Sequence, residues 1–223
     1  MRWILAMMLV VLAGAMCAAG CERRSGGQST GGAGGDGGGS IRVVATVSMV
    51  GDMVREVAGD RATVRVLMGE GVDPHLFKPT RDDIAALMGA DVVFANGLML
   101  EGRMGEALER VRAAGRTVVL VAETLDRAAL HADASGEKTH DPHVWMDPVL
   151  WATAIPSVRD ALASRDPAGR EAYERRAAAY AARLEELHAY ATRVLGSVPE
   201  ASRVLVTAHD AFGYFARLRS AAS

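Results

Sequence analysis

From residue 41 onwards, runs of consecutive apolar residues alternate with segments whose apolar residues recur every three or four positions. Residues 41–47 (IRVVATV) form a β-branched run that is too apolar for a half-exposed strand and predicts a buried one. A helical pattern follows, and we expect Ser48 to cap it. Further strands are predicted at residues 63–68, 91–95 and 117–121. Strands that alternate with helices indicate an α/β fold with a parallel sheet.

Two short motifs mark the starts of other helices. Thr80 and Asp83 have the spacing of a capping-box variant, which predicts a helix that begins beside them. Asp147 followed by Pro148 has the chemistry of an N-cap and a first helical residue. We expect this later helix to run to about Leu162.

Residues 168–195 predict one long helix, because the segment has no proline and its only glycine is near its start. The helix would have about 28 residues and a length near 42 Å at about 1.5 Å per residue. Its apolar and small residues recur in alternating steps of four and three: Tyr173, Ala177, Tyr180, Leu184, Leu187, Ala191 and Val194. A coiled-coil dimer is one interpretation of this stripe, but its alanines and tyrosines favour a helix that packs along its own chain. Beyond it, residues 203–207 (RVLVT) predict a strand that starts a second lobe.

The first forty residues have the features of an exported, membrane-tethered segment. Arg2, an apolar run and small residues before Cys21 form the parts of a secretory signal, which predicts that residues 1–20 are removed. The end of the signal resembles a bacterial lipoprotein box, in which Cys21 would be acylated, although Ala18 stands where leucine is usual. A plain cleaved signal is the alternative. The glycine-rich remainder of residues 21–40 predicts a flexible tether.

Composition excludes several classes of function. The 223 residues are 50% hydrophobic, and 25 basic residues against 27 acidic ones give a net charge of −2. We therefore expect neither nucleic acid nor an anionic membrane surface as an electrostatic partner. Both cysteines precede residue 22, so a metal site in the folded part must use His, Asp or Glu. No phosphate-binding glycine loop follows the first predicted strand, and the sequence has neither a Gly-x-Ser-x-Gly elbow nor a His-Glu-x-x-His motif.

Three histidines lie in loops that prolines or helix caps make stiff: His75, His143 and His209. Neutral imidazole suits Zn²⁺ and other late divalent ions, so these residues are candidate metal ligands. Taken singly, each is also consistent with a hydrogen-bonded histidine in a turn. His131 and His140 lie in a polar stretch and are candidates only for an accessory metal contact, while His188 is interpreted as a solvated helix residue.

Three blocks of sequence together resemble one known family. They are residues 71–102 (GVDPHLFKPTRDD through LMLEG), 141–151 (DPHVWMDPVLW) and 204–216 (VLVTAHDAFGYFA). In order and spacing they are similar to the zinc and manganese solute-binding proteins of bacterial ABC importers, the TroA-like group. The similarity covers residues 41–216 and implies two α/β lobes with parallel sheets linked by one long rigid helix. It also implies that His75, His143 and His209 bind the metal ion, and three imidazoles favour Zn²⁺ over Mn²⁺.

The resemblance gives a domain organisation: signal peptide 1–20, lipidated Cys21 and tether 21–40, N-terminal lobe 41–165, linking helix 166–197, and the start of an incomplete second lobe at 198–223. The carboxylate that serves as fourth ligand in the family has no counterpart in this sequence, so we expect a C-terminally truncated lobe. The function implied is that of a monomeric, non-enzymatic, periplasmic or cell-surface protein, which delivers metal to an ABC permease in the inner membrane. A zinc hydrolase that uses Asp210 or Asp141 and a non-functional truncated copy are the alternatives, and an adhesive role stays open.

Overall fold

The computed structural model describes residues 40–133, 136 and 140–218, and the predictions made for residues 1–39 lie outside this part of the chain. The strands are β1 (Ile41–Val47), β2 (Ala62–Met68), β3 (Val92–Ala95) and β4 (Thr117–Leu120). The α-helices are α1 (Ser48–Ala58), α2 (Arg81–Gly89), α3 (Gly105–Ala113), α4 (Pro148–Ala152), α5 (Ile155–Arg165), α6 (Arg170–Gly196) and α7 (Gly213–Arg217). The four strands predicted within residues 41–121 and the helices predicted after the first strand and after Thr80 are confirmed, whereas α3 was not predicted.

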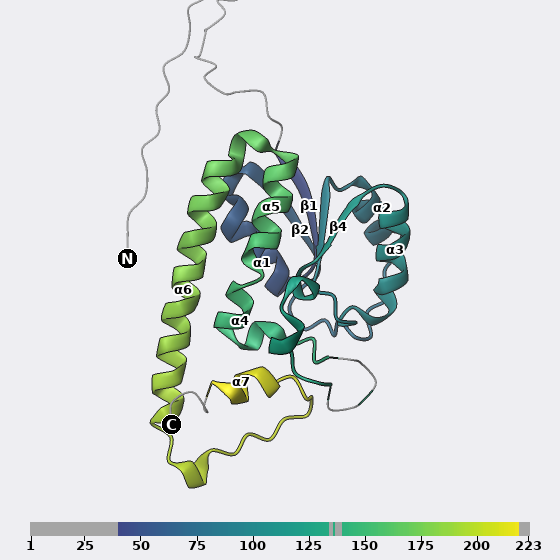
Figure 1. Ribbon diagram of the computed structural model, residues 1–223. Coiled ribbons are helices and arrows are strands. Elements are labelled where there is room, and N and C mark those ends of the chain that lie inside the picture. Colours follow the sequence, from purple (N-terminus) through teal and green to yellow (C-terminus); the bar gives the residue numbers. More distant parts are fainter. Residues whose placement is uncertain (1–39, 134–135, 137–139, 219–223) are drawn as a thin grey trace, which may run out of the picture. The chain divides into compact units, whose positions relative to one another are not determined.

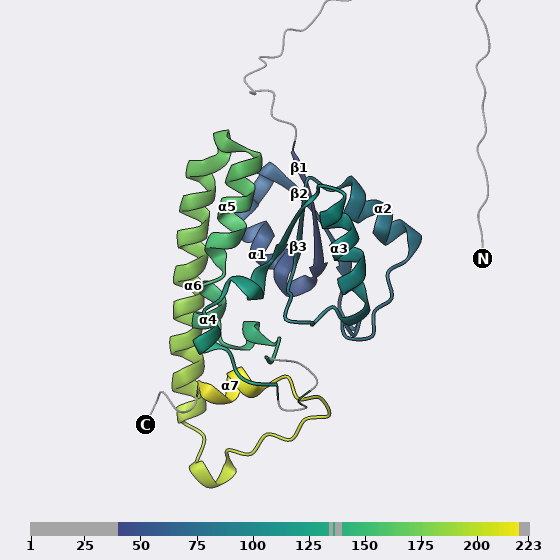
Figure 2. The ribbon, with the colours of Figure 1, turned by 45° about the vertical axis from the view of Figure 1, so that its right-hand side comes forward.

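The strands form one parallel sheet in the order β2-β1-β3-β4. Helices α2 and α3 cover one face, and α1 and α5 cover the other (Figure 1). Helix α6 packs outside α1, α4 and α5 as a further layer on that second side (Figure 2). Because all strands are parallel, the loops after them meet at one edge of the sheet, where ligands bind in this class of fold.

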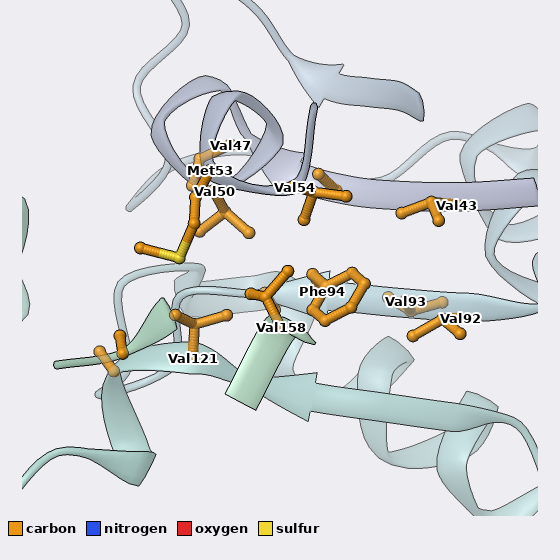
Figure 3. Packing of buried hydrophobic residues seen from close by; sticks show 14 of the residues in the cluster. Val43, Val47, Val50, Met53, Val54, Val92, Val93, Phe94, Val121 and Val158 are labelled. Atoms are coloured by element: carbon orange, nitrogen blue, oxygen red, sulfur yellow. The ribbon is translucent and has the colours of Figure 1, made fainter. Parts of the chain in front are cut away.

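The hydrophobic core lies between the sheet and the helices of both faces. Only Arg42 of β1 is exposed, which confirms the expectation of a buried central strand. Figure 3 shows core side chains from the sheet and its covering helices, with Phe94 of β3 next to Val158 of α5. Both of these residues are fully buried. Continuous apolar strands are stable here because both faces of the sheet are covered.

The predicted helix starts are partly confirmed. The Thr80 hydroxyl accepts a hydrogen bond from the Asp83 amide while the Asp83 carboxylate accepts one from the Thr80 amide, so the capping box is complete. Asp147 caps α4, as expected. Ser48 is not a cap, because the N-cap position falls on Val47 and Ser48 is the first helical residue.

Two other predictions about secondary structure are wrong. The helix expected from residue 148 to Leu162 is divided into α4 and α5, because Pro156 has no amide proton and its ring would clash with the carbonyl of Ala152. Residues 203–207 form no strand. Val204 and Val206 are 78% and 87% exposed, and the described part of the chain places no neighbouring strand there to pair with the backbone.

Helix α6 is attached to the rest of the fold mainly through its first half. Tyr173 is fully buried and donates a hydrogen bond to Asp166, which also pairs with Arg61 at 2.7 Å. Burial and the neighbouring carboxylate raise the pKa of Tyr173 to about 12. The apolar stripe is covered as far as Leu184, while Leu187, further along, is 49% exposed. Even with its 27 residues α6 is too polar to cross a bilayer, and the other described helices offer no candidate span.

Asp91 joins three parts of the fold at the amino-terminal edge of the sheet. Its carboxylate accepts hydrogen bonds from the backbone amide and guanidinium of Arg42 on β1, and from the guanidinium of Arg165 at the end of α5. The Arg42 guanidinium, the Arg42 amide and the Arg165 guanidinium hold the pKa of this carboxyl well below its usual range. Ionised Asp91 therefore stabilises the folded state.

We predict that Asp91→Asn lowers the melting temperature by a few degrees at neutral pH, and that this difference from the unaltered chain becomes smaller in acid. The folded pKa lies below the unfolded value of about 3.9, so the stabilisation is present above that pH and is lost as the pH falls below it. Thermal unfolding followed by circular dichroism from pH 7 to pH 3 measures this. Asp60→Asn, at an exposed residue with no ion pair in the described structure, serves as the control. An equal difference in melting temperature between Asp91→Asn and the unaltered chain at pH 7 and pH 3 would contradict the stabilising role of ionised Asp91.

Candidate metal centre

Three histidines from distant parts of the sequence meet at one point. His75 lies between β2 and α2, His143 immediately precedes the 3-10 turn before α4, and His209 lies in the irregular segment before α7. The Nε2 atom of His75 is 3.3 Å from that of His143 and 3.3 Å from that of His209, and the last two are 3.0 Å apart. The ring centroids are farther apart, at 4.9–5.4 Å, so the nitrogen-bearing edges face one another.

This triangle of nitrogens fits a single cation. Bonds of 2.0–2.1 Å to a tetrahedral zinc ion place its ligand atoms roughly 3.3 Å apart. Hydrogen bonds among the rings satisfy the group less well, because the proton or lone pair of each Nε2 points in one direction and serves only one neighbour. A cation between the rings serves all three lone pairs. Among the described residues, this is the one group of three or more His, Cys, Asp or Glu side chains with ligand atoms within 4.8 Å of one another.

The three histidines differ in burial. His143 is buried, His75 is half-buried and His209 is exposed, so the site is closed on the side of the sheet and open on the side of His209. Solvent therefore reaches the cluster on the side of His209. His209 is also on the most exposed backbone, where Thr207 donates a hydrogen bond to its carbonyl.

The His143 ring is held by a carboxylate. Its Nδ1 lies 2.7 Å from Oδ1 of Asp141, and the same oxygen accepts a hydrogen bond from the His143 amide. An ionised carboxylate only accepts, so the ring proton sits on Nδ1 and Nε2 keeps its lone pair for a metal ion. Tyr214 of α7 donates a hydrogen bond to the Asp141 carbonyl and fixes this turn to the C-terminal part of the chain.

Asp141 is ionised in this arrangement. Burial by itself raises the pKa of its carboxyl, but the hydrogen bonds from the His143 ring and amide and the nearby His143 and His131 charges together bring the pKa below its ordinary value. A negative charge behind the imidazole makes Nε2 a stronger electron donor. The pair therefore favours a bound cation over an empty site.

The backbone of His75 makes two contacts that help to position it. The Asp73 carboxylate accepts a hydrogen bond from the His75 amide, which closes a local turn. On its other side the His75 carbonyl lies against Gly102, where an added Cβ would come within 2.4 Å of the oxygen. The loop after β3 therefore contacts the loop that carries the first histidine.

The two accessory candidates lie outside the cluster. His131 stacks on the ring of Tyr214 with centroids 4.3 Å apart, and its amide donates to the Tyr214 hydroxyl. His140 lines a cavity of about 250 Å³ together with Leu98, Met99, Glu123, Arg127 and Leu130. Neither side chain belongs to the group of converging ligand atoms. His131 instead supports the turn that holds Asp141.

Sequence reasoning overlooked the residues that support the histidines. Asp141 was considered only as a possible base, although its position two residues before His143 is a signal for a carboxylate–imidazole pair. Tyr214 gives no local signal, since it lies 73 residues from Asp141 in the sequence. Glu101, a buried carboxylate beside the site, was also missed. The signal there is one acidic residue in an otherwise apolar and glycine-rich segment (NGLMLEG).

Residues 43–219 match the protein family described as zinc-uptake complex component A, periplasmic. The zinc-binding protein TroA of Treponema pallidum is 42% identical over 178 residues, which cover 78% of this chain and 56% of that protein. The manganese-binding lipoprotein MntA of Bacillus subtilis is 36% identical over 209 residues, 94% of this chain and 65% of that protein. The chain thus spans less than two thirds of the length of these curated relatives.

Solved structures of metal-binding proteins are also similar to this chain. The periplasmic zinc-binding protein TroA of Treponema pallidum superposes with a TM-score of 0.77 at 40% identity, over 81% of this chain and 64% of that one. Zn(II)-bound AdcA of Streptococcus pneumoniae superposes with a TM-score of 0.69 at 28% identity, over 80% of this chain and 37% of that one. The expected fold class, an α/β fold with a parallel sheet and one long helix, is confirmed.

We predict that Asp141→Asn weakens zinc binding by about 10- to 100-fold, the usual effect of changing a group that orients a ligand. The amide keeps an acceptor for the His143 ring but removes the negative charge behind it. Competition with a chromogenic chelator at pH 7 measures the affinity. Asp126→Asn is the matched control, because Asp126 also accepts from a backbone amide two residues later but contacts no histidine. Equal affinities of Asp141→Asn and the unaltered chain would contradict the role of Asp141.

Proposed function

The chain belongs to the periplasmic zinc-uptake component A family, and on this premise we propose that it captures a divalent metal ion outside the cytoplasm and delivers it to an ABC permease. Zn²⁺ is the first candidate for the ion and Mn²⁺ the second. The observation that carries this proposal is the convergence of the Nε2 atoms of His75, His143 and His209 at 3.0–3.3 Å.

The chemistry of the ligands supports zinc. Imidazole nitrogen suits Zn²⁺, whereas Mn²⁺ prefers carboxylate, carbonyl and water oxygens. Three nitrogens leave a coordination position of a tetrahedral ion open. The open position lies on the exposed side of the cluster, where a further ligand or water can complete the shell. Some relatives of similar sequence carry names that refer to manganese, so the second ion belongs in the proposal.

A binding role is favoured over a zinc hydrolase. Hydrolysis by a zinc-bound water needs a general base within hydrogen-bond reach of that water. In the described part of the chain, no carboxylate oxygen belongs to the cluster of ligand atoms. Asp141, one of the two acidic residues considered for this role, is engaged with the ring of His143 on the side away from the metal position. In this proposal the site binds and releases an ion, and no covalent bond is made or broken.

The placement in the cell follows from the N-terminal sequence. We propose that residues 1–20 direct export, that Cys21 is acylated and holds the protein at the membrane, and that residues 21–40 form the tether. In this proposal the protein acts as a monomer, with residues 41–165 as one lobe and residues 166–197 as the linking helix. The tether lets the metal site reach a permease in the same membrane.

Substitution of each of the three histidines by alanine is the direct test. We expect His75→Ala, His143→Ala and His209→Ala each to lower zinc affinity at least tenfold, because two imidazoles remain where three converged. Mass spectrometry under native conditions and chelator competition on the full chain measure stoichiometry and affinity. His188→Ala on α6 is the control, since His188 is outside the cluster. Unchanged zinc content in all three site variants would reject the proposal.

Zinc affinity is expected to fall as the pH drops from 7.5 to 5. Imidazole must be deprotonated to bind a metal ion, and free imidazole takes up a proton near pH 6.5. Protons therefore compete with the zinc ion in acid, and the zinc affinity decreases as the pH falls. Isothermal titration in buffers of different ionisation enthalpy measures both the affinity and the protons released. A flat affinity over this range would contradict binding by histidine.

A further inference from the structure

The carboxylate of Glu101 is buried in the loop that follows β3 and forms no hydrogen bond with the three histidines. Glu101 is 3% exposed and lies just beyond the carboxyl end of β3. Its Oε1 accepts hydrogen bonds from the Thr46 hydroxyl at 2.7 Å and the Asn96 amide at 2.6 Å, and its Oε2 accepts one from the Gly97 amide at 3.0 Å. No basic side chain of the described residues forms an ion pair with it. Such a group is costly to bury, so the hydrogen bonds it accepts are its compensation.

These three hydrogen bonds hold an unusual loop. Gly97, Leu98 and Met99 all have positive φ angles, of 82°, 52° and 61°. Residues other than glycine rarely adopt this conformation, because the Cβ atom then crowds the backbone. Such a conformation persists where the surroundings determine it. Glu101 closes the loop by binding the amides at its start, and through Thr46 it attaches the loop to the end of β1.

The same loop contacts the segment that carries His143. The Asn96 side-chain amide donates hydrogen bonds to the carbonyls of Gly97 and Pro142, each at 3.1 Å. Pro142 directly precedes His143. Asn96 is fully buried, so movement of this loop would break a hydrogen bond that water cannot replace.

On its other side the loop contacts the segment that carries His75. Gly102 follows Glu101 with a φ of +39°, and its Cα lies so close to the His75 carbonyl oxygen that a Cβ would stand 2.4 Å from it. Since that neighbour is backbone, a larger residue at position 102 has to displace the His75 segment. One loop, held by one carboxylate, therefore contacts the segments of two of the three proposed ligands.

We propose that Glu101 is a positioning residue of the metal centre, which sets the distance between His75 and His143 by fixing the loop of residues 96–102. This proposal rests on the metal site proposed above. It assigns to Glu101 a role in the affinity and geometry of metal binding, in addition to the stability that any buried, hydrogen-bonded group supplies.

Three variants test the loop at different points, each in the full chain. Glu101→Gln keeps the size of the side chain, but its NH₂ group replaces one of the two oxygens that accept hydrogen bonds. A donor then faces a donor, and at least one of these hydrogen bonds is lost. Thr46→Val removes the hydroxyl donor without changing the shape of the side chain. Gly102→Ala leaves Glu101 intact and pushes on the His75 carbonyl. Leu162→Ala on α5, a fully buried residue away from the loop, is the control for a general loss of stability.

Two readouts separate positioning from stability. Zinc affinity is measured by chelator competition at 25 °C, where melting curves show each variant to be folded, and ligand geometry is measured from the d–d absorption bands of bound Co²⁺. We expect Glu101→Gln and Gly102→Ala to lower zinc affinity about 10- to 100-fold and to change the Co²⁺ spectrum. Thr46→Val is expected to have a smaller effect of the same kind. Leu162→Ala is expected to melt at a lower temperature while keeping the affinity and spectrum of the unaltered chain.

The outcomes distinguish this inference from the proposed function. If the unaltered chain binds neither Zn²⁺ nor Co²⁺, the proposed function fails. If it binds both, and the loop variants match its affinity and spectrum while only their melting temperatures fall, the positioning role of Glu101 is overturned. Should Glu101→Gln not fold, Thr46→Val and Gly102→Ala decide the question by the same two readouts, since both act on the loop that Glu101 holds.

Discussion

The site depends on bringing together three imidazole nitrogens that are separated along the chain by 68 and 66 residues. Each nitrogen attracts a cation only weakly by itself, and a shared ion is bound tightly only if the three lone pairs meet at one point. Small displacements matter, because metal–nitrogen bonds near 2.0–2.1 Å tolerate deviations of about 0.2 Å. The rest of the structure is best understood by how it meets this requirement.

The parallel sheet meets it in part by its topology. The loops after β2 and β3 leave the sheet at the same edge, so the His75 segment and the loop of residues 96–102 are neighbours although a helix separates them in sequence. The segment that carries His143 reaches the same edge through the Asn96–Pro142 hydrogen bond. His209 is held differently, from an exposed segment connected by way of Tyr214 and Asp141. Two of the three proposed ligands are therefore fixed to the sheet, and the third is carried by the part of the chain that follows α6.

This difference between the ligands has a mechanical consequence. Helix α6 packs on α1, α4 and α5, and its buried residues end at Leu184, while Leu187 and Val194 beyond it are exposed apolar side chains. His209 follows that less tightly packed end. Tyr214 and Arg217 already join these two regions through contacts with His131, Asp141 and Asp147. A metal ion bound between the three rings, as proposed, would add a further connection. Binding of the ion and ordering of the segment around His209 are thus expected to be coupled.

The sequence by itself determined the features that arise from neighbouring residues. The buried run of β1, the capping box at Thr80 and the N-cap at Asp147 follow from local periodicity and side-chain chemistry, and the three histidine blocks carried the family resemblance. Tertiary structure decided what depends on distant partners. Residues 203–207 have a strand-like composition but no neighbour to bond with, and Ser48 lost the cap position that its residue type suggested. The convergence of the histidines, and the roles proposed for Asp141 and Glu101, depend on distances between residues far apart in the sequence and on burial. A short stretch of sequence does not determine either of these.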